Sequence, residues 1–96
     1  MMRYVVCISE STRSQNIRFK SYIEKTGLGW WHYFENVWLI TDNQEKTNCK
    51  ELRNNVKNIF EGENVFVIQM AGDSQNDTWA GFGKTTMFEW IHKCWK

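Results

Sequence analysis

The sequence predicts a small α+β domain in which helices cover one face of an antiparallel sheet. Short apolar runs rich in β-branched and aromatic residues are typical of strands, and they alternate with segments whose apolar residues recur at helical spacing. Their order is strand, helix, strand, strand, helix, strand and a final helix. The 96 residues contain no Pro, no internal repeat and no low-complexity segment, so we expect one domain that spans residues 1–96.

The first predicted strand is the apolar run Tyr4–Ile8, and a polar loop follows it to Ser14. A helix then extends to about Lys25, and Gly27 supplies the left-handed conformation that ends many helices. The apolar residues of this helix lie at positions i, i+3 and i+4 of one face: Phe19, Tyr22 and Ile23.

The segment from Trp30 to Thr41 is the most aromatic part of the chain. Its 12 residues are long for one strand in a small domain, and Glu35-Asn36 is the polar pair inside it. We therefore predict strands over about 30–34 and 37–41 that meet at this pair in a tight turn or a bulge. Because side chains alternate across a strand, we expect three on one face, namely Trp30, His32 and Phe34, and two on the other, Trp31 and Tyr33.

A second helix and a last strand follow. Asn48 with Glu51 has the spacing of a capping box, and the apolar residues after it recur at helical spacing up to Phe60. Residues 65–68 form the last predicted strand, and residues 71–84 form a polar loop.

Thr86 with Glu89 has the capping-box spacing again, which predicts a short terminal helix over residues 87–95. The complete order is therefore βαββαβ with one additional helix. Right-handed crossovers would place four antiparallel strands under two helices. The predicted fold is a ferredoxin-like two-layer sandwich with an extra C-terminal helix.

The charge balance is close to neutral. Twelve Lys and Arg oppose 11 Asp and Glu, which gives a net charge of +1. Proteins that bind long nucleic acids mainly through phosphates carry a clear basic excess. The composition therefore favours a small nucleotide over a long polyanion.

The cysteines indicate a reducing compartment. Their number is odd and their spacing is wide: Cys7, Cys49 and Cys94. We therefore expect a cytoplasmic protein without disulfides. No apolar run approaches the ~20 residues that span a membrane, so we expect no membrane partner.

The block Gly29-Trp-Trp-His-Tyr-Phe-Glu-Asn-Val-Trp-Leu-Ile resembles the second-strand signature of the SinR family of small proteins. The segments Val65-Phe-Val-Ile-Gln, Trp79-Ala-Gly-Phe and Glu89-Trp-Ile resemble the rest of that family pattern, so the resemblance covers nearly the whole chain. SinR-family proteins are similar in fold to the small subunit of the CRISPR spacer-integration complex. The resemblance implies a ferredoxin-like fold and a homodimer joined through sheet edges, and it implies little about activity.

One position departs from the pattern of those CRISPR relatives. There an Asp closes the first strand and is the proposed metal ligand at the dimer axis, whereas this chain has Ser9. A hydroxyl does not replace a carboxylate oxygen on Mg²⁺, which argues against an inherited metal-dependent nuclease activity. We expect no catalytic residues, no metal and no cofactor. A metal-dependent nuclease or phosphodiesterase is the alternative, and the acids to test for it are Glu10, Asp73 and Asp77.

The stretch from Gly81 to Thr86 resembles the end of a phosphate-binding loop. The full pattern needs a Gly where the chain has Thr78, so we do not expect a nucleotide-hydrolysing site. Two interpretations stay open. The backbone N–H groups, Lys84 and the helix start bind an anion, or the stretch is an ordinary loop that caps a helix.

The aromatic strand has two interpretations as well. Nucleic-acid-binding sheets stack bases on such side chains, and dimer interfaces or a terminal helix bury them.

We interpret the protein as a non-catalytic homodimer that binds a nucleotide-like or nucleic-acid ligand. Such a small protein could sequester a signalling nucleotide in host–virus conflict. A pure protein-interaction module is a further alternative. The candidate ligand contacts are Trp30, His32, Trp79, Lys84, Thr85, Arg13 and Arg18.

Overall fold

The computed structural model describes residues 1–70 and 79–95, and in these ranges it contains four strands and three α-helices. The strands are β1 (Met2–Ile8), β2 (Gly29–Phe34), β3 (Val37–Asp42) and β4 (Val65–Met70). The helices are α1 (Arg13–Thr26), α2 (Cys49–Ile59) and α3 (Glu89–Cys94), and the 3-10 turn η1 (Thr85–Phe88) leads into α3.

The strands form a single sheet in the order β2-β3-β1-β4. β1 pairs with β3 and β4, β2 pairs with β3, and every pairing is antiparallel. Each of α1 and α2 therefore connects two parallel strands that have a third strand between them. This is the ferredoxin-like βαββαβ arrangement, so the predicted fold and the predicted turn at Glu35-Asn36 are confirmed.

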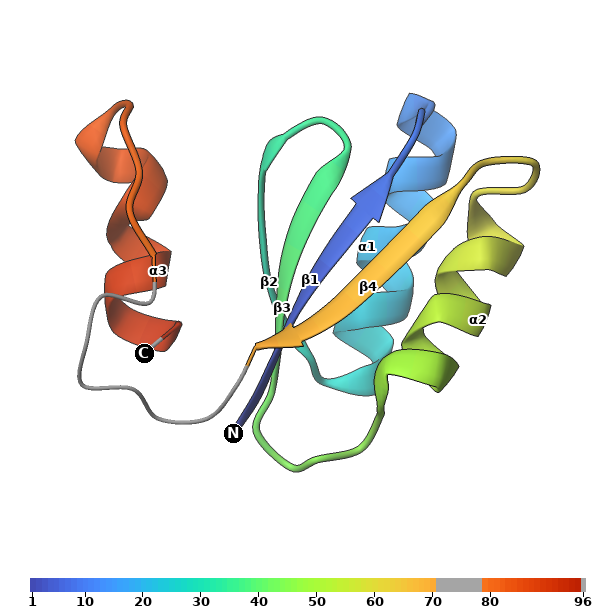
Figure 1. The fold of residues 1–96 in the computed structure, drawn as a ribbon, viewed down its shortest axis with the longest axis horizontal. Coiled ribbons are helices and arrows are strands. Elements are labelled where there is room, and N and C mark those ends of the chain that lie inside the picture. Colours follow the sequence, from blue (N-terminus) through green and yellow to red (C-terminus); the bar gives the residue numbers. More distant parts are fainter. Residues whose placement is uncertain (71–78, 96) are drawn as a thin grey trace.

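The sheet has helices on both sides. α1 and α2 cover one face, which we call the inner face, and α3 lies on the side of the other, outer face (Figure 1). The main core lies between the inner face and the two helices. Its most completely buried large side chains are Trp38, Tyr4, Phe19, Phe60 and Ile23.

A second apolar cluster holds α3 on the outer face. Trp31 of β2 packs with Ile91 and Trp95 of the terminal segment, and each is at most 3% exposed. Two hydrogen bonds fix the position of the terminal segment on the outer face. The Trp31 Nε1–H donates to the carbonyl of Met87 at 2.7 Å, and Arg3 Nη1 donates to the carbonyl of Trp95 at 2.8 Å. Large rings with one polar atom suit such a site, because the polar atom is bonded while the ring is buried.

Two helix starts differ from the prediction. α1 begins at Arg13, inside the predicted polar loop, because Thr12 and Gln15 form a capping box. The predicted capping box at Thr86 and Glu89 is wrong. Residues 85–88 form a 3-10 turn instead, and neither η1 nor α3 has a side-chain cap.

The predicted facing of Phe34 is also wrong. Trp31 pairs with Leu39 and Phe34 pairs with Val37, so two residues of β2 lie opposite one residue of β3. This β-bulge inserts one residue and shifts the alternation. The ring of Phe34 consequently lies 5.3 Å from that of Trp31, on the outer face.

We expect Ile91→Ala to lower the free energy of unfolding by about 2 kcal/mol or more, because it deletes a buried side chain that helps to dock α3. The control is Phe82→Ala, which removes a fully exposed ring and should leave stability unchanged. Urea unfolding followed by circular dichroism measures both. Equal, small effects would show that α3 docking does not stabilise the domain.

The stability should also fall in alkali. Burial, together with the nearby charge of Asp42, raises the pKa of Tyr4 above its ordinary value of 10.0. The folded chain therefore keeps a proton that the unfolded chain loses, so the free energy of unfolding decreases as the pH rises from 10.0 toward the folded pKa. Burial raises the pKa of Tyr22 in the same direction.

Tyr4→Phe should reduce this alkaline decrease. It also removes the hydrogen bond from the Tyr4 hydroxyl to the carbonyl of Thr47, which costs about 1 kcal/mol at every pH. Urea unfolding at a series of pH values on either side of pH 10 separates the two effects. An unchanged slope above pH 10 in both Tyr4→Phe and Tyr22→Phe would contradict this account.

Candidate functional site

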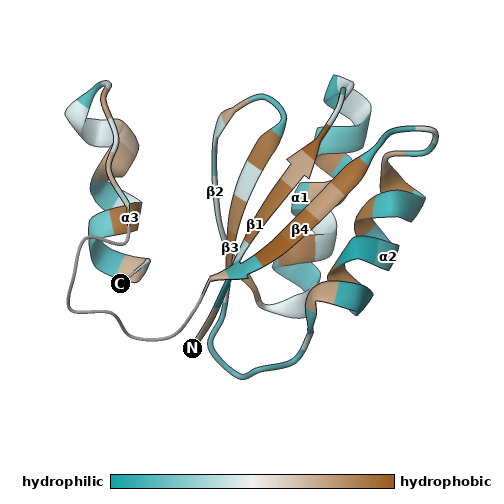
Figure 2. Cartoon of the chain, in the orientation of Figure 1, coloured by the Kyte–Doolittle hydropathy of each residue, from teal (hydrophilic) through white to brown (hydrophobic). Residues whose placement is uncertain are grey.

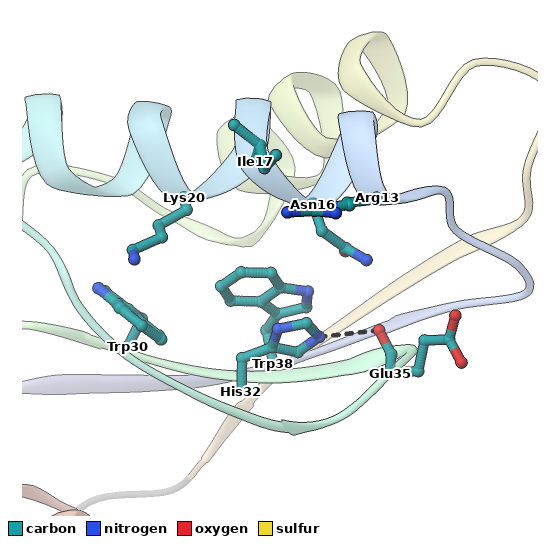
Figure 3. Close-up of a pocket in the computed structure, with 8 residues that line it drawn as sticks. All are labelled: Arg13, Asn16, Ile17, Lys20, Trp30, His32, Glu35 and Trp38. Atoms are coloured by element: carbon teal, nitrogen blue, oxygen red, sulfur yellow. Dashed lines mark hydrogen bonds between the residues drawn. The ribbon is translucent and has the colours of Figure 1, made fainter.

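A pocket of about 410 Å³ lies between α1 and the β2–β3 hairpin (Figure 3). Its volume is in the range of small-molecule sites. Eight side chains line it: Arg13, Asn16, Ile17, Lys20, Trp30, His32, Glu35 and Trp38. We call it the α1–β2 pocket.

The helix supplies its lining residues in a regular pattern. Arg13, Asn16, Ile17 and Lys20 stand at positions i, i+3, i+4 and i+7 of α1, so they form one stripe along the helix. This stripe lies beside the buried stripe that contains Phe19. Because Phe19 fixes the rotation of α1 on the sheet, the polar stripe must overhang the β2 side.

The floor of the pocket is aromatic. The Trp38 indole is 1% exposed, and the imidazole of His32 stacks on it with the ring centroids 3.7 Å apart and the planes inclined by 6°. The half-buried ring of Trp30 lies 5.8 Å from Trp38. The pocket thus presents planar, π-rich surfaces of the kind on which heterocycles stack.

Backbone geometry holds His32 in place. Its Nε2 lies 2.8 Å from the carbonyl oxygen of Glu35, in the turn that follows β2. A carbonyl only accepts, so Nε2 carries the hydrogen and Nδ1 of a neutral ring is an acceptor. The partner is the backbone of Glu35 and not its carboxylate, so His32 and Glu35 do not form a carboxylate–imidazole pair.

Two cations complete the pocket. The ammonium of Lys20 lies 5.1 Å from the centroid of the Trp30 ring, a cation–π contact that Figure 3 shows from the side. Arg13 stands two turns closer to the start of the helix and lines the same pocket. Both side chains are exposed, so they are available to an anion.

Two buried polar atoms at the pocket have no hydrogen-bond partner among the described residues: Asn16 Oδ1 and Trp38 Nε1. The amide of Asn16 is oriented by Ser11, whose hydroxyl accepts from Nδ2 at 3.1 Å and donates to Asn36 at 2.8 Å. An unpaired buried donor or acceptor costs ~1–3 kcal/mol. Such atoms are explained by a water or a ligand that completes them.

The structure brings three of the seven candidate contacts together, namely Arg13, Trp30 and His32. Arg18 is exposed on α1 and does not line this pocket. Trp79 lies with the α3 cluster, where its ring stacks on Phe88 at 5.8 Å.

Lys84 and Thr85 are exposed at the start of η1, outside the α1–β2 pocket. Close packing explains why glycines stand beside these two residues. A Cβ on Gly81 would lie 2.6 Å from the ring of Phe88, and one on Gly83 would lie 3.3 Å from the sulfur of Met87. The chain passes closely over these two side chains, which supports the interpretation as an ordinary loop.

Sequence reasoning missed Lys20, Asn16 and Trp38. The signal for the first two was present, since they share a helix stripe with Arg13. No local signal shows that a ring such as Trp38 both fills the core and borders a pocket.

Ser9 follows directly after β1, at the position where the sequence predicts no metal ligand. The Ser9 hydroxyl donates to the carboxylate of Glu63 at 2.8 Å and accepts from the backbone N–H of Asn64 at 2.9 Å. Glu10 beside it is exposed. Asp73 and Asp77 lie outside the described residues. Within those residues, no three His, Cys, Asp or Glu side chains gather as metal ligands do.

Comparison with known proteins gives no relative: no protein-family profile, no curated protein and no solved structure matches this chain. Among the described residues, no helix has the length and apolar character needed to cross a membrane.

Proposed function

We propose that this protein is a non-catalytic binding module whose α1–β2 pocket holds a nucleotide-like or nucleic-acid ligand. The observation that carries the proposal is the joint lining of one pocket by stacked aromatic rings and two exposed cations. A base would stack against Trp30 and His32, and its phosphate would contact Lys20 and Arg13.

The unpaired atoms are compatible with the proposal but do not select the ligand. Asn16 Oδ1 and Trp38 Nε1 have almost no accessible surface, so the edge of a heterocycle would bond to them only after the two side chains move. The resemblance to the SinR family, and the proposed role as a cytoplasmic sequestering protein in host–virus conflict, are part of this proposal.

We also propose that the protein is a homodimer. A row of apolar side chains crosses all four strands on the outer face at the end that the α3 cluster does not cover: Phe34, Val37, Cys7 and Phe66. Phe34 is 50% and Phe66 is 59% exposed, and Ile68 beside them is 42% exposed. The neighbouring edge strand β4 carries no charge and no Pro, the usual protection against pairing. A second copy of this chain would cover both features.

For the ligand, we expect at least one of the four common ribonucleoside monophosphates to bind the purified protein in isothermal titration calorimetry. Trp30→Leu should raise its Kd about tenfold, because stacking of a base on an aromatic ring contributes ~1–3 kcal/mol. Lys20→Gln should weaken binding several-fold through the lost phosphate contact.

Lys93→Gln is the matched control. It removes one exposed lysine from α3, away from the pocket, and should leave the Kd unchanged. Native mass spectrometry of protein purified from cells would also reveal a ligand that is already bound. No binding of any nucleotide, or binding that is equally strong in Trp30→Leu, would contradict the proposed function.

For the dimer, we expect analytical ultracentrifugation to give twice the chain mass and Phe66→Asp to give a monomer, because a charge on the exposed row opposes burial. Phe82→Asp places the same charge on another exposed ring, outside the row, and should stay dimeric. A wild-type protein that is monomeric at every concentration would disprove the homodimer.

A further inference from the structure

The helical layer carries most of the positive charge of the chain. α1 and α2 together have seven basic residues and two acidic ones, so their net charge is +5 in a chain whose net charge is +1. The rest of the chain is correspondingly acidic. The near-neutral total therefore hides an uneven distribution of charge along the chain, and the overall charge balance does not describe the surface that a ligand meets.

These basic side chains are open to solvent. All seven are exposed: Arg13, Arg18, Lys20, Lys25, Lys50, Arg53 and Lys57. In residues 1–70 and 79–95, none of them forms an ion pair with a carboxylate. Cations that are neither buried nor neutralised by the protein itself are available to an external polyanion.

The charges extend across the whole layer, which lies on one side of the sheet and whose two helices contain both hydrophilic and hydrophobic residues (Figures 1 and 2). At one flank, Arg13 and Lys20 line the α1–β2 pocket. Between the helices, Lys25 and Lys46 border a shared groove. At the other flank, α2 presents a basic stripe beside β4 that begins with Lys50 and Arg53. Two helices side by side are about 20 Å wide, so the path suits several successive phosphates.

The lining of the α1–β2 pocket indicates which class of polyanion would bind the helical layer. Its stacked rings suit a base whose face is free. Only a single strand offers such a base, because in a duplex the bases are already stacked and paired. An acidic protein or an anionic membrane would use the cations but not the aromatic pocket.

We propose that the helical layer binds a single strand of nucleic acid, with one base in the α1–β2 pocket and the following phosphates on α1 and α2. The inference rests on the proposed function of the pocket and extends it. The ligand is then a strand and not a free nucleotide.

The test is fluorescence anisotropy of a labelled single strand of about ten nucleotides, within the site sizes known for single-strand binders, at several salt concentrations. We expect the strand to bind at least tenfold more tightly than the mononucleotide of the same base, with an affinity that falls as salt rises. The triple variant Lys50→Gln, Arg53→Gln, Lys57→Gln should reduce the slope of log K against log salt by about 2, since each lost phosphate contact contributes ~0.7.

Lys93→Gln, which changes one lysine on α3, should leave that slope unchanged. A strand that binds no more tightly than the mononucleotide, or a slope that is equal in the triple variant and the wild type, would overturn this inference while leaving the proposed nucleotide pocket intact. Heparin or anionic vesicles that bind as tightly as the strand would overturn the assignment to nucleic acid. Failure of mononucleotides and strands alike would instead reject the pocket itself.

Discussion

The contact between Phe19 and Trp38 is the interaction on which the rest of the structure depends. The two rings meet edge to face at 4.8 Å, and both are almost completely buried. This contact sets how α1 is rotated on the inner face. The rotation decides which stripe of α1 overhangs β2, and the same indole that fills the core offers its other surface to His32. The core and the pocket therefore share one side chain.

The sheet separates two kinds of surface. The inner face is covered by a helical layer rich in exposed cations. On the outer face, the apolar row beside the α3 cluster remains exposed. A polyanion suits the first surface, and an apolar partner suits the second. Because they face in opposite directions, a dimer formed through Phe34 and Phe66 would leave the α1–β2 pocket of each protomer accessible.

The β2–β3 hairpin shows where local reasoning stops. Composition and length were sufficient to place a turn at Glu35-Asn36. Strict alternation then put Phe34 with His32, but the bulge between Trp31 and Phe34 moves Phe34 to the outer face while His32 stays over Trp38. A bulge depends on how two strands pair, and the residues of β2 alone carry no sign of it.

The sequence by itself determined the order of elements, the ferredoxin-like class, the end of α1 at Gly27 and the start of α2 after Asn48, because periodicity and caps are properties of neighbouring residues. Only the tertiary structure decided that Arg13 and His32 share a pocket while Trp79 lies across the sheet with α3. It also decided that cations spread along a neutral sequence gather on one layer. Residues far apart in the chain become neighbours only when helices and strands bury their apolar faces together, and that packing is a property of the whole fold.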